Sequence, residues 1–250
     1  GFDQAGEKQL FAAPCFVFVQ GSAWREQNVY GQLAQVAKLA AKGYVCAIVE
    51  YRHSGIAGFP AQARDTRNAI RYLRQNAGRY GIDPERMVVA GDSSGGHTAM
   101  WAAMLQDDGS TDNHFPGVHA GVKGIVNFYG STSVMAADSN PMTTNHGLPD
   151  SPEGMVMGGQ NLLEHPELAR ALSVECNIHG DTQLPPVLIF HGTKDRVVNC
   201  EGSAILYRRL RETGHRARLC LVTGADHGGP EFWTEAVLEK VDEFCNSCFG

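Results

Sequence analysis

The residues best suited to chemistry lie around Ser93. The stretch Gly91-Asp92-Ser93-Ser94-Gly95 contains a Gly-x-Ser-x-Gly pattern between an apolar run and a segment of helical length. In that setting the pattern predicts a sharp strand-to-helix turn, with small residues that avoid clashes with the neighbouring backbone. The turn puts the serine hydroxyl at a helix N-terminus, where developing negative charge is stabilised. Ser93 is the predicted nucleophile; Ser94 is the alternative, although its register would require glycine in place of Asp92.

A serine nucleophile needs a base, and the base needs an acid that orients it. Asp195 follows the apolar run 187–190, and His227 follows the run 219–222. The chain order serine, acid, histidine is the one found with this type of turn. Taken singly, Asp195 is equally well read as a turn or helix cap, and His227 as an exposed loop residue. Their joint order after strands favours a triad of Ser93, Asp195 and His227.

The nine other histidines fit the position of the base less well. His97 is expected to pack on the helix that follows the turn, and His191 to support the acid-bearing loop. Asp226 is adjacent to His227, but neighbouring side chains diverge in an extended loop, so Asp226 is not the predicted acid.

Acyl transfer also needs backbone N–H groups that bind the negatively charged oxygen of the intermediate. Ser94, the residue after the nucleophile, is expected to supply one. The loop after the apolar run 15–19 contains the small residues Gly21, Ser22 and Ala23, so the N–H groups of Ser22 and Ala23 are candidates for the second. The alternative is that this loop is only a tight turn.

Six short apolar runs alternate with segments of helical length. Continuous apolar runs rich in Val and Ile predict strands buried on both faces of a parallel sheet. The alternation predicts the α/β class, with a doubly wound, mostly parallel sheet and helices on both faces. In one helix, apolar residues recur at three- and four-residue spacing, which assigns its arginines, Arg67 and Arg71 among them, to the other face. The expected strands are 15–19, 45–49, 87–90, 122–126, 187–190 and 219–222, and the expected helices 29–42, 61–79, 95–106, 201–213 and 231–246.

Composition limits the class of protein. A chain of 250 residues suits one domain spanning 1–250, and 43% hydrophobic with 19% charged residues excludes a disordered chain. The net charge of −6 argues against a nucleic-acid partner, and no apolar run reaches the roughly 18 residues of a membrane span.

Compartment and redox state are predicted from the N-terminus and the cysteines. Gly1-Phe2-Asp3-Gln4 does not open a basic segment followed by an apolar stretch, so no secretory signal is expected. Seven cysteines, an odd number, several of them inside apolar runs, favour reduced thiols and a cytoplasmic location. Cys245 and Cys248 have C-x-x-C spacing without a second pair or a nearby histidine pair, so no metal and no cofactor are predicted.

Acidic charge is concentrated in one segment. Residues 131–180 contain six acidic side chains and one arginine, so they carry −5 of the net −6. The segment is also rich in Ser, Asn, Pro and Gly, which predicts an insertion on a more regular scaffold.

Together these motifs resemble the α/β-hydrolase esterases and lipases, specifically the hormone-sensitive-lipase-like and feruloyl- and acetyl-xylan-esterase-like branch. The resemblance runs from about Ala12 onward. One departure is Gln20-Gly-Ser-Ala in place of the His-Gly-Gly-Gly of lipase relatives, which is similar to the xylan-esterase-like members. The motifs that carry the resemblance are Gln20-Gly-Ser-Ala-Trp24, Glu50-Tyr-Arg52, Phe59-Pro60, Asp65, Ala69-Ile-Arg-Tyr-Leu73, Tyr80-Gly-Ile-Asp-Pro84, Gly91-Asp-Ser-Ser-Gly-Gly-His97, His191-Gly-Thr-Lys-Asp195 and His227-Gly-Gly-Pro-Glu-Phe-Trp233.

The resemblance implies a carboxylic-ester substrate, with short acyl groups such as acetyl and a small-molecule or oligosaccharide alcohol. In the family, insertions after the sixth strand overhang the active site, which implies a cap-like role for 131–180. Aromatic and sulfur-containing side chains near the catalytic loops are candidates for the substrate pocket: Trp24, Tyr129, Met155, Met157, Phe232 and Trp233.

Two other functions stay open at this point. One is a serine peptidase of the prolyl-oligopeptidase type, although those enzymes carry a large propeller domain that 250 residues do not accommodate. The other is a ligand-binding member of the same fold without catalysis, although such proteins commonly lose the histidine that stands here at His227. The sequence makes no prediction of oligomeric state.

Overall fold

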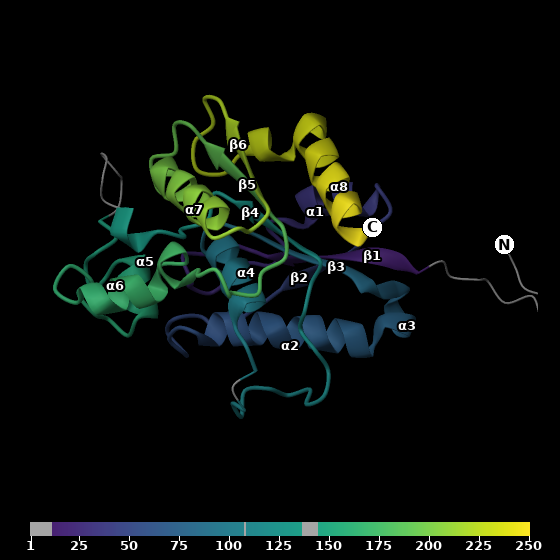
Figure 1. The fold of residues 1–250 in the computed structure, drawn as a ribbon, viewed down its shortest axis with the longest axis horizontal. Coiled ribbons are helices and arrows are strands. Elements are labelled where there is room, and N and C mark those ends of the chain that lie inside the picture. Colours follow the sequence, from purple (N-terminus) through teal and green to yellow (C-terminus); the bar gives the residue numbers. More distant parts are fainter. Residues whose placement is uncertain (1–11, 108, 137–144) are drawn as a thin grey trace, which may run out of the picture.

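The protein is built on one sheet of parallel strands. The structure, a computed structural model, describes residues 12–107, 109–136 and 145–250. Within them the strand order is β2-β1-β3-β4-β5-β6, and every neighbouring pair is parallel (Figure 1). Each strand contains or overlaps one of the six predicted runs, so the predicted fold class is confirmed. The strands are β1 (Ala13–Val19), β2 (Val45–Val49), β3 (Ile82–Asp92), β4 (Gly124–Phe128), β5 (Val187–Gly192) and β6 (Ala217–Val222).

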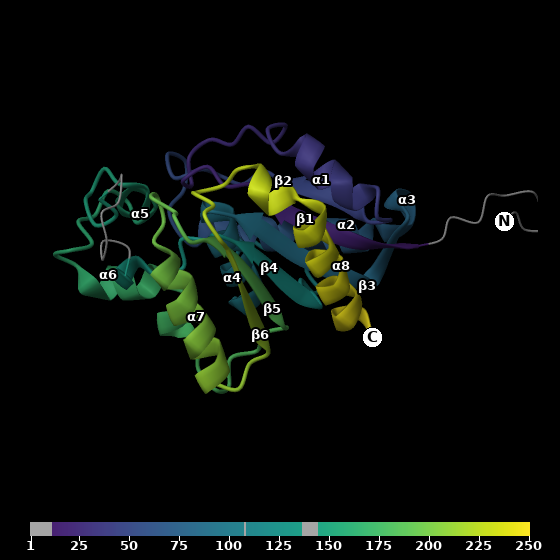
Figure 2. The same ribbon diagram turned by 90° about the horizontal axis from the view of Figure 1, so that it is seen from above.

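Helices cover both faces of the sheet (Figure 2). On one face, α1 (Leu33–Ala40) and α8 (Glu235–Phe249) share an apolar cluster with the strands. On the other face lie α2 (Ala61–Gln75), α4 (Ser94–Met104) and α7 (Cys200–Glu212). The short α3 (Ala77–Tyr80) follows α2, and the 3-10 turn η3 (Pro230–Trp233) precedes α8. The predicted helix 231–246 therefore starts as a 3-10 turn.

The central strands are apolar throughout because both of their faces are buried. In β1, Cys15, Val17 and Val19 join the cluster with α2 and α4, whereas Phe16 and Phe18 join the cluster with α1 and α8. Successive side chains of a strand point to opposite faces, so a strand covered on both sides loses the alternation of apolar and polar residues.

The prediction for the arginines of α2 is wrong at two positions. Arg67 and Arg71 are 9% and 2% exposed rather than on the solvent face. Arg67 donates to the carbonyl oxygen of Ala102 at 3.0 Å, and both guanidinium groups pair with the Asp107 carboxylate. A segment beyond α4 therefore covers a face that helical periodicity alone assigns to water.

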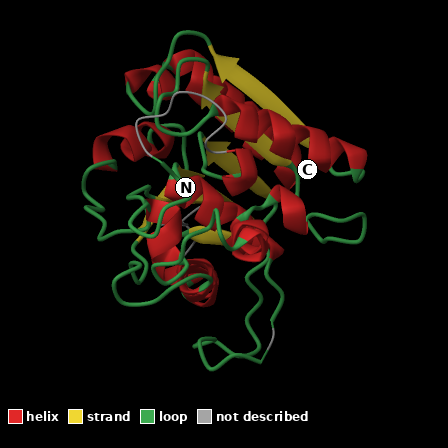
Figure 3. Ribbon diagram, turned by 90° about the vertical axis from the view of Figure 1, so that its left-hand side faces the viewer, coloured by secondary structure: helices red, strands yellow, loops and turns green. Residues whose placement is uncertain are grey.

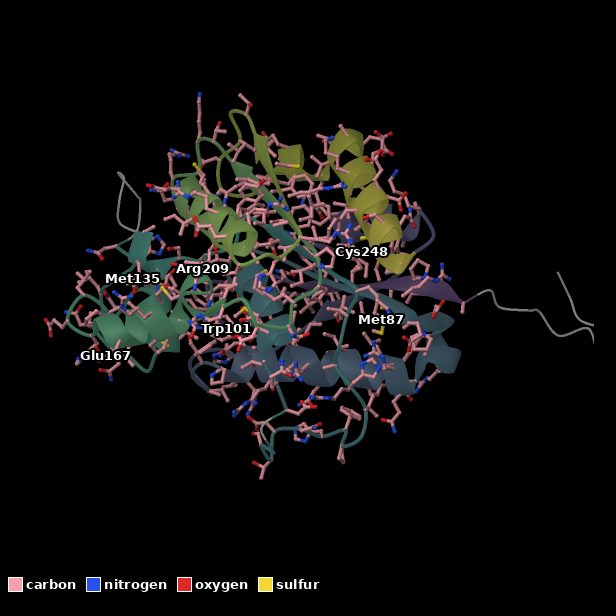
Figure 4. All side chains as sticks on the ribbon, viewed as in Figure 1. Met87, Trp101, Met135, Glu167, Arg209 and Cys248 are labelled. Carbon is pink, nitrogen blue, oxygen red and sulfur yellow. The ribbon has the colours of Figure 1, made fainter. Side chains whose placement is uncertain are left out.

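The described residues of the segment 131–180 form an irregular lobe at one end of the sheet, drawn in teal to green at the left of Figure 1, the side that faces the viewer in Figure 3. It follows β4, the fourth strand of the described residues. It contains η1 (Val134–Ala136), α5 (Pro152–Val156), α6 (Pro166–Leu172) and η2 (Glu175–Asn177). Figure 4 labels Met135 and Glu167 on this lobe. Its apolar cluster consists of Trp24, Val134, Val156, Leu162, Ala169 and Leu172.

The acidity of this lobe is not all on its surface. Glu153 and Glu175 are 1% and 7% exposed, and each accepts a hydrogen bond from a buried serine hydroxyl, Ser131 and Ser133 respectively. Burial raises the pKa of Glu175. Asp138 lies outside the described residues. The acids of the lobe that are exposed are Asp150, Glu164 and Glu167.

In the described residues, no helix combines the length and the apolar character that crossing a membrane requires. All seven cysteines are present as free thiols, and burial raises the pKa of Cys245 in α8.

Candidate active site

Parallel strands bring the predicted site residues to one edge of the sheet. Ser93 follows β3, and the loop 20–24 follows the neighbouring β1. Asp195 and His227 come after β5 and β6. The chain runs from β1 outward to β2 and then returns to β3 on the other side, so Ser93 and the loop 20–24 flank the point where strand order reverses. Ligands bind at such a point in open α/β sheets.

The turn at Ser93 is as tight as the Gly-x-Ser-x-Gly pattern predicts. Ser93 has φ 54° and ψ −125°, in the left-handed half of backbone space that L side chains rarely adopt. A Cβ at Gly95 would lie 2.0 Å from the carbonyl oxygen of Val19, and one at Gly91 would lie 2.3 Å from the carbonyl oxygen of Gly95. The two glycines therefore let β1, β3 and α4 approach closely enough to hold the strained serine.

We expect Gly95→Ala to destabilise the fold by roughly 3 kcal/mol, the upper end of the usual overpacking range, because the methyl group meets rigid backbone of β1. Gly78→Ala is the matched control, since a Cβ there has open space around it and α3 gains a better helix former. Urea unfolding of both variants measures the difference. Equal stability of the two variants would contradict the close packing of α4 on β1.

The structure brings Ser93, His227 and Asp195 together in one hydrogen-bonded line. His227 Nε2 lies 2.9 Å from Ser93 Oγ, and His227 Nδ1 lies 2.8 Å from Asp195 Oδ2. An ionised carboxylate only accepts, so Nδ1 carries the hydrogen and Nε2 is left to accept the hydroxyl proton of Ser93. The arrangement can therefore deprotonate a serine hydroxyl.

The Asp195 carboxylate is ionised although it is buried. Burial raises its pKa, but hydrogen bonds from His191 and His227, the charge of His227 and a backbone N–H outweigh burial and lower the pKa well below its ordinary value. Asp195 Oδ1 accepts from the N–H groups of Val197 and Val198 at 2.9 and 2.8 Å. These bonds fix the acid in one orientation towards His227.

The candidate oxyanion donors differ in how they are engaged. The N–H of Ser22 donates to Ser94 Oγ at 3.0 Å. Within the described ranges, the N–H groups of Ala23 and Ser94 donate to no acceptor. Ala23 and Trp24 both have positive φ, at 56° and 53°. The geometry thus leaves Ala23 and Ser94, rather than Ser22, free to bind a substrate oxygen.

A buried carboxylate beside the nucleophile holds this loop. Asp92 is 6% exposed, and its Oδ1 accepts from the N–H of Gly21 at 2.6 Å. Its Oδ2 accepts from the Tyr129 hydroxyl at 3.3 Å and from Gln32 Nε2 at 3.4 Å. Burial raises the pKa of Asp92. No role was predicted for Asp92, although its position directly before Ser93 is a usable signal.

We expect Asp92→Ala to lower kcat by about 10²–10³-fold, the effect of a lost oxyanion donor, because Gly21 loses its anchor and the loop 20–24, which carries the N–H of Ala23, is released. Asp92→Asn keeps an acceptor oxygen for Gly21 and should lose less than about tenfold. Steady-state kinetics on an activated ester compares the two variants. If asparagine were as damaging as alanine, the charge rather than the acceptor would be the important property of Asp92.

Four aromatic residues predicted for the substrate pocket are all buried. Phe232 and Trp233 are 0% and 3% exposed, and the ring of Trp233 packs on Phe18 and on Phe128, so these two residues belong to the core instead. Trp24 is 1% exposed and belongs to the apolar cluster of the lobe. Tyr129 stays beside the site. Of the two methionines, Met155 is 39% exposed, and Met157 packs on the lobe cluster.

Two tyrosines support the site, Tyr129 with its ring and Tyr51 with its hydroxyl group. The ring of Tyr129 lies edge-on to His227, with centroids 5.0 Å apart, and φ of Tyr129 is 40°. The Tyr51 hydroxyl lies 2.9 Å from Ser22 Oγ and 3.4 Å from Ser94 Oγ. Tyr51 belongs to the motif Glu50-Tyr-Arg52, but the sequence predicted no role for its hydroxyl, because its partners Ser22 and Ser94 are far away along the chain.

The neighbouring titratable residues have other partners. Asp226 binds Arg196, whose Nε donates at 2.6 Å, rather than the imidazole of His227. His97 is buried with Nε2 2.9 Å from the carbonyl oxygen of Leu172, and burial lowers its pKa to about 4. Across residues 12–107, 109–136 and 145–250, no three His, Cys, Asp or Glu side chains are grouped as a metal ion would need.

Comparison with known sequences finds relatives over most of the chain. The BD-FAE family model matches residues 4–210. Esterase LipC of Mycobacterium tuberculosis is 30% identical over 86% of this chain and 53% of its own length. Isoprenylcysteine alpha-carbonyl methylesterase ICME of Arabidopsis thaliana is 26% identical over 86% of this chain and 50% of its own length. The chain thus spans about half the length of the curated relatives it matches.

Comparison with solved structures finds the same fold. A truncated form of a carbohydrate esterase from gut microbiota aligns with a TM-score of 0.82 and 25% identity, covering 98% of this chain and 88% of that one. A propionate-bound esterase, Est2, of Thermogutta terrifontis aligns with a TM-score of 0.75 and 24% identity, covering 98% and 87%. The second likeness bears on the fold alone. These neighbours confirm the α/β-hydrolase fold.

Proposed function

Since the chain belongs to the BD-FAE family, we propose that it is a serine carboxylic-ester hydrolase that works through an acyl-enzyme on Ser93. The observation that carries the proposal is the hydrogen-bonded line from Ser93 Oγ to His227 Nε2, at 2.9 Å, and from His227 Nδ1 to Asp195 Oδ2, at 2.8 Å. Esterase names among the relatives support the same reaction class.

In the first half-reaction, His227 Nε2 takes the proton of Ser93 as Oγ attacks the ester carbonyl. The oxygen of the tetrahedral intermediate becomes negatively charged, and the N–H groups of Ala23 and Ser94 stabilise it. As the intermediate collapses, the C–O bond to the alcohol breaks, and His227 returns its proton to the leaving alkoxide. The product is the alcohol, with the acyl group left on Ser93.

In the second half-reaction a water molecule replaces the alcohol. His227 Nε2 removes a proton from the water as its oxygen attacks the acyl carbonyl, and the same N–H groups bind the oxyanion. The bond to Ser93 Oγ then breaks, and Oγ regains a proton from His227. Asp195 stays ionised throughout and stabilises the imidazolium. The acid is released and the enzyme is regenerated without a cofactor or metal.

The substrate class is a short-chain ester, acetyl above all, including esters on a carbohydrate alcohol. Support comes from the carbohydrate esterase that covers 98% of this chain at 25% identity. The lobe 131–180 is taken as a cap-like insertion on one domain spanning 1–250. Two contacts place the lobe beside the catalytic loops. Trp24 of the loop 20–24 packs into the lobe, and His146 Nε2 lies 2.6 Å from the carbonyl oxygen of Val197, two residues after Asp195.

A substrate panel tests the proposal. It contains p-nitrophenyl acetate, butyrate and octanoate, acetylated xylo-oligosaccharides, methyl ferulate and peptide p-nitroanilides. We expect turnover of the esters, with acetate and butyrate above octanoate, and none of the anilides. Turnover of anilides without ester turnover would favour the peptidase alternative. Binding of an ester without turnover of any substrate in the panel would favour a ligand-binding protein.

A further inference from the structure

His191 is a second histidine on the proposed triad acid. It lies in β5 and is 0% exposed. Its Nε2 is 3.1 Å from Asp195 Oδ2 and 3.0 Å from the carbonyl oxygen of Val198. Its Nδ1 is 2.7 Å from Ser203 Oγ in α7. A buried imidazole with a defined partner at each nitrogen has one fixed orientation.

The partners of His191 determine where its hydrogen is. A carboxylate and a carbonyl only accept, so the Nε2 atom that faces both of them must carry the hydrogen. The Ser203 hydroxyl can donate to Nδ1, which satisfies a neutral imidazole completely. His191 is therefore a fixed N–H donor to Asp195 Oδ2, the same oxygen that receives His227 Nδ1 at 2.8 Å.

Sharing this oxygen couples the two histidines. A hydrogen bond that stabilises the charge of a carboxylate makes the carboxylate a weaker attractor of a second proton or cation. In accord with this, the hydrogen bonds from His191 and His227 both lower the pKa of Asp195. Without that donor, Asp195 would attract the imidazolium form of His227 more strongly, and His227 would stay protonated to higher pH.

We infer that His191 is a positioning residue that orients Asp195 and weakens its hold on protonated His227, so that His227 is available as a base at lower pH. The inference rests on the proposed function only for its kinetic readout. Other titratable groups surround the pair, and none of them hydrogen-bonds the Asp195 carboxylate within the described residues. They are Asp92 at the end of β3, Tyr129 after β4, Cys200 in α7, and Arg196 and Asp226 in the two catalytic loops.

Three variants separate the hydrogen bond from packing. His191→Leu fills the site without any donor. His191→Asn places an amide near the position of Nδ1, towards Ser203, but does not reach Asp195. His191→Gln can place an amide N–H near the position of Nε2 and is the conservative rescue. If His191→Leu does not fold, the pair of Asn and Gln still compares a variant without the donor to a variant with it.

The readout is the pH at which His227 titrates, followed by NMR of protein labelled with 15N-histidine, together with the acidic limb of the kcat/KM profile. We expect His227 to titrate about one pH unit higher in His191→Leu and His191→Asn, the size of one lost hydrogen bond to a charged group. His191→Gln should stay within about 0.3 pH unit of the wild type.

Each outcome bears on a different claim. An unchanged titration in folded Leu and Asn variants, or a Gln variant that shifts as much as they do, would overturn the positioning role and leave His191 as packing. The NMR titration needs no substrate. If the wild type hydrolysed no ester while His227 still shifted, the proposed function would fail and the role of His191 would stand.

Discussion

Ser93→Ala is expected to lower kcat for ester hydrolysis by about 10⁶-fold, the loss typical of an enzyme deprived of its serine nucleophile. Without Oγ no acyl-enzyme forms, and only water attack aided by the oxyanion donors remains. KM should change little, because the hydroxyl is small and the rest of the site is intact. The measurement is kcat on p-nitrophenyl acetate, combined with mass spectrometry after a fluorophosphonate reagent, which should label Ser93 in the wild type alone.

Two controls separate the hydroxyl of Ser93 from its surroundings. Ser94→Ala keeps the backbone N–H of residue 94 and should lose no more than about tenfold, which tests the alternative nucleophile. Ser93→Gly should be as inactive as Ser93→Ala but about 1 kcal/mol more stable, because glycine adopts the backbone angles of φ 54° and ψ −125° without strain. Ester turnover that survives in Ser93→Ala and disappears in Ser94→Ala would assign the chemistry to the other serine.

The strands of the sheet, and the site residues that follow them, were predictable because they depend on local sequence patterns. An apolar run buried on both faces leaves a clear signal, and each predicted run lies within or overlaps one of the strands β1 to β6. The meeting of Ser93, Asp195 and His227 at one edge then followed from topology, since parallel strands align their carboxyl ends. In these cases the catalytic side chain lies in, or at the start of, the loop or turn that follows the strand that positions it.

Features that depend on distant partners were not predictable in the same way. Arg67 and Arg71 are buried because Asp107, about 40 positions away, lies against them. Phe232 and Trp233 follow the histidine loop, which suggested a pocket, but they lie in η3, just before α8, and both side chains pack into the core. A residue's position near a motif therefore says less than the direction of its side chain, which the whole fold determines.

The same limit applies to the support of the site. The bond from Gly21 to Asp92 spans 71 positions, and no spacing rule connects the two. His191, by contrast, is only four residues from Asp195, and its predicted support of the acid-bearing loop agrees with the geometry. What the sequence did not reveal is that His191 uses the same carboxylate oxygen as His227.

Asp195→Asn is expected to lower kcat by about 10⁴-fold while leaving the fold intact. The carboxylate receives four hydrogen bonds: Val197 and Val198 donate to Oδ1, and the two histidines to Oδ2. An amide cannot accept on both sides. If its NH₂ group faces His227, then Nδ1 must accept and the hydrogen moves to Nε2, so the base can no longer take a proton from Ser93. If the NH₂ group faces the backbone, it meets two N–H donors.

The pH dependence of stability gives a second test of the same variant. The pKa of Asp195 in the folded protein lies well below its ordinary value of 3.8. A depressed pKa stabilises the fold above the ordinary value, and this contribution is lost as pH falls towards the folded value. The wild type should therefore have a larger free energy of unfolding than Asp195→Asn at neutral pH, and the difference should narrow below about pH 4.

Asp226→Asn, which alters a carboxylate bound to Arg196, is the kinetic control and should lose less than about tenfold in kcat. A loss equal to that of Asp195→Asn would move the role of the acid to Asp226.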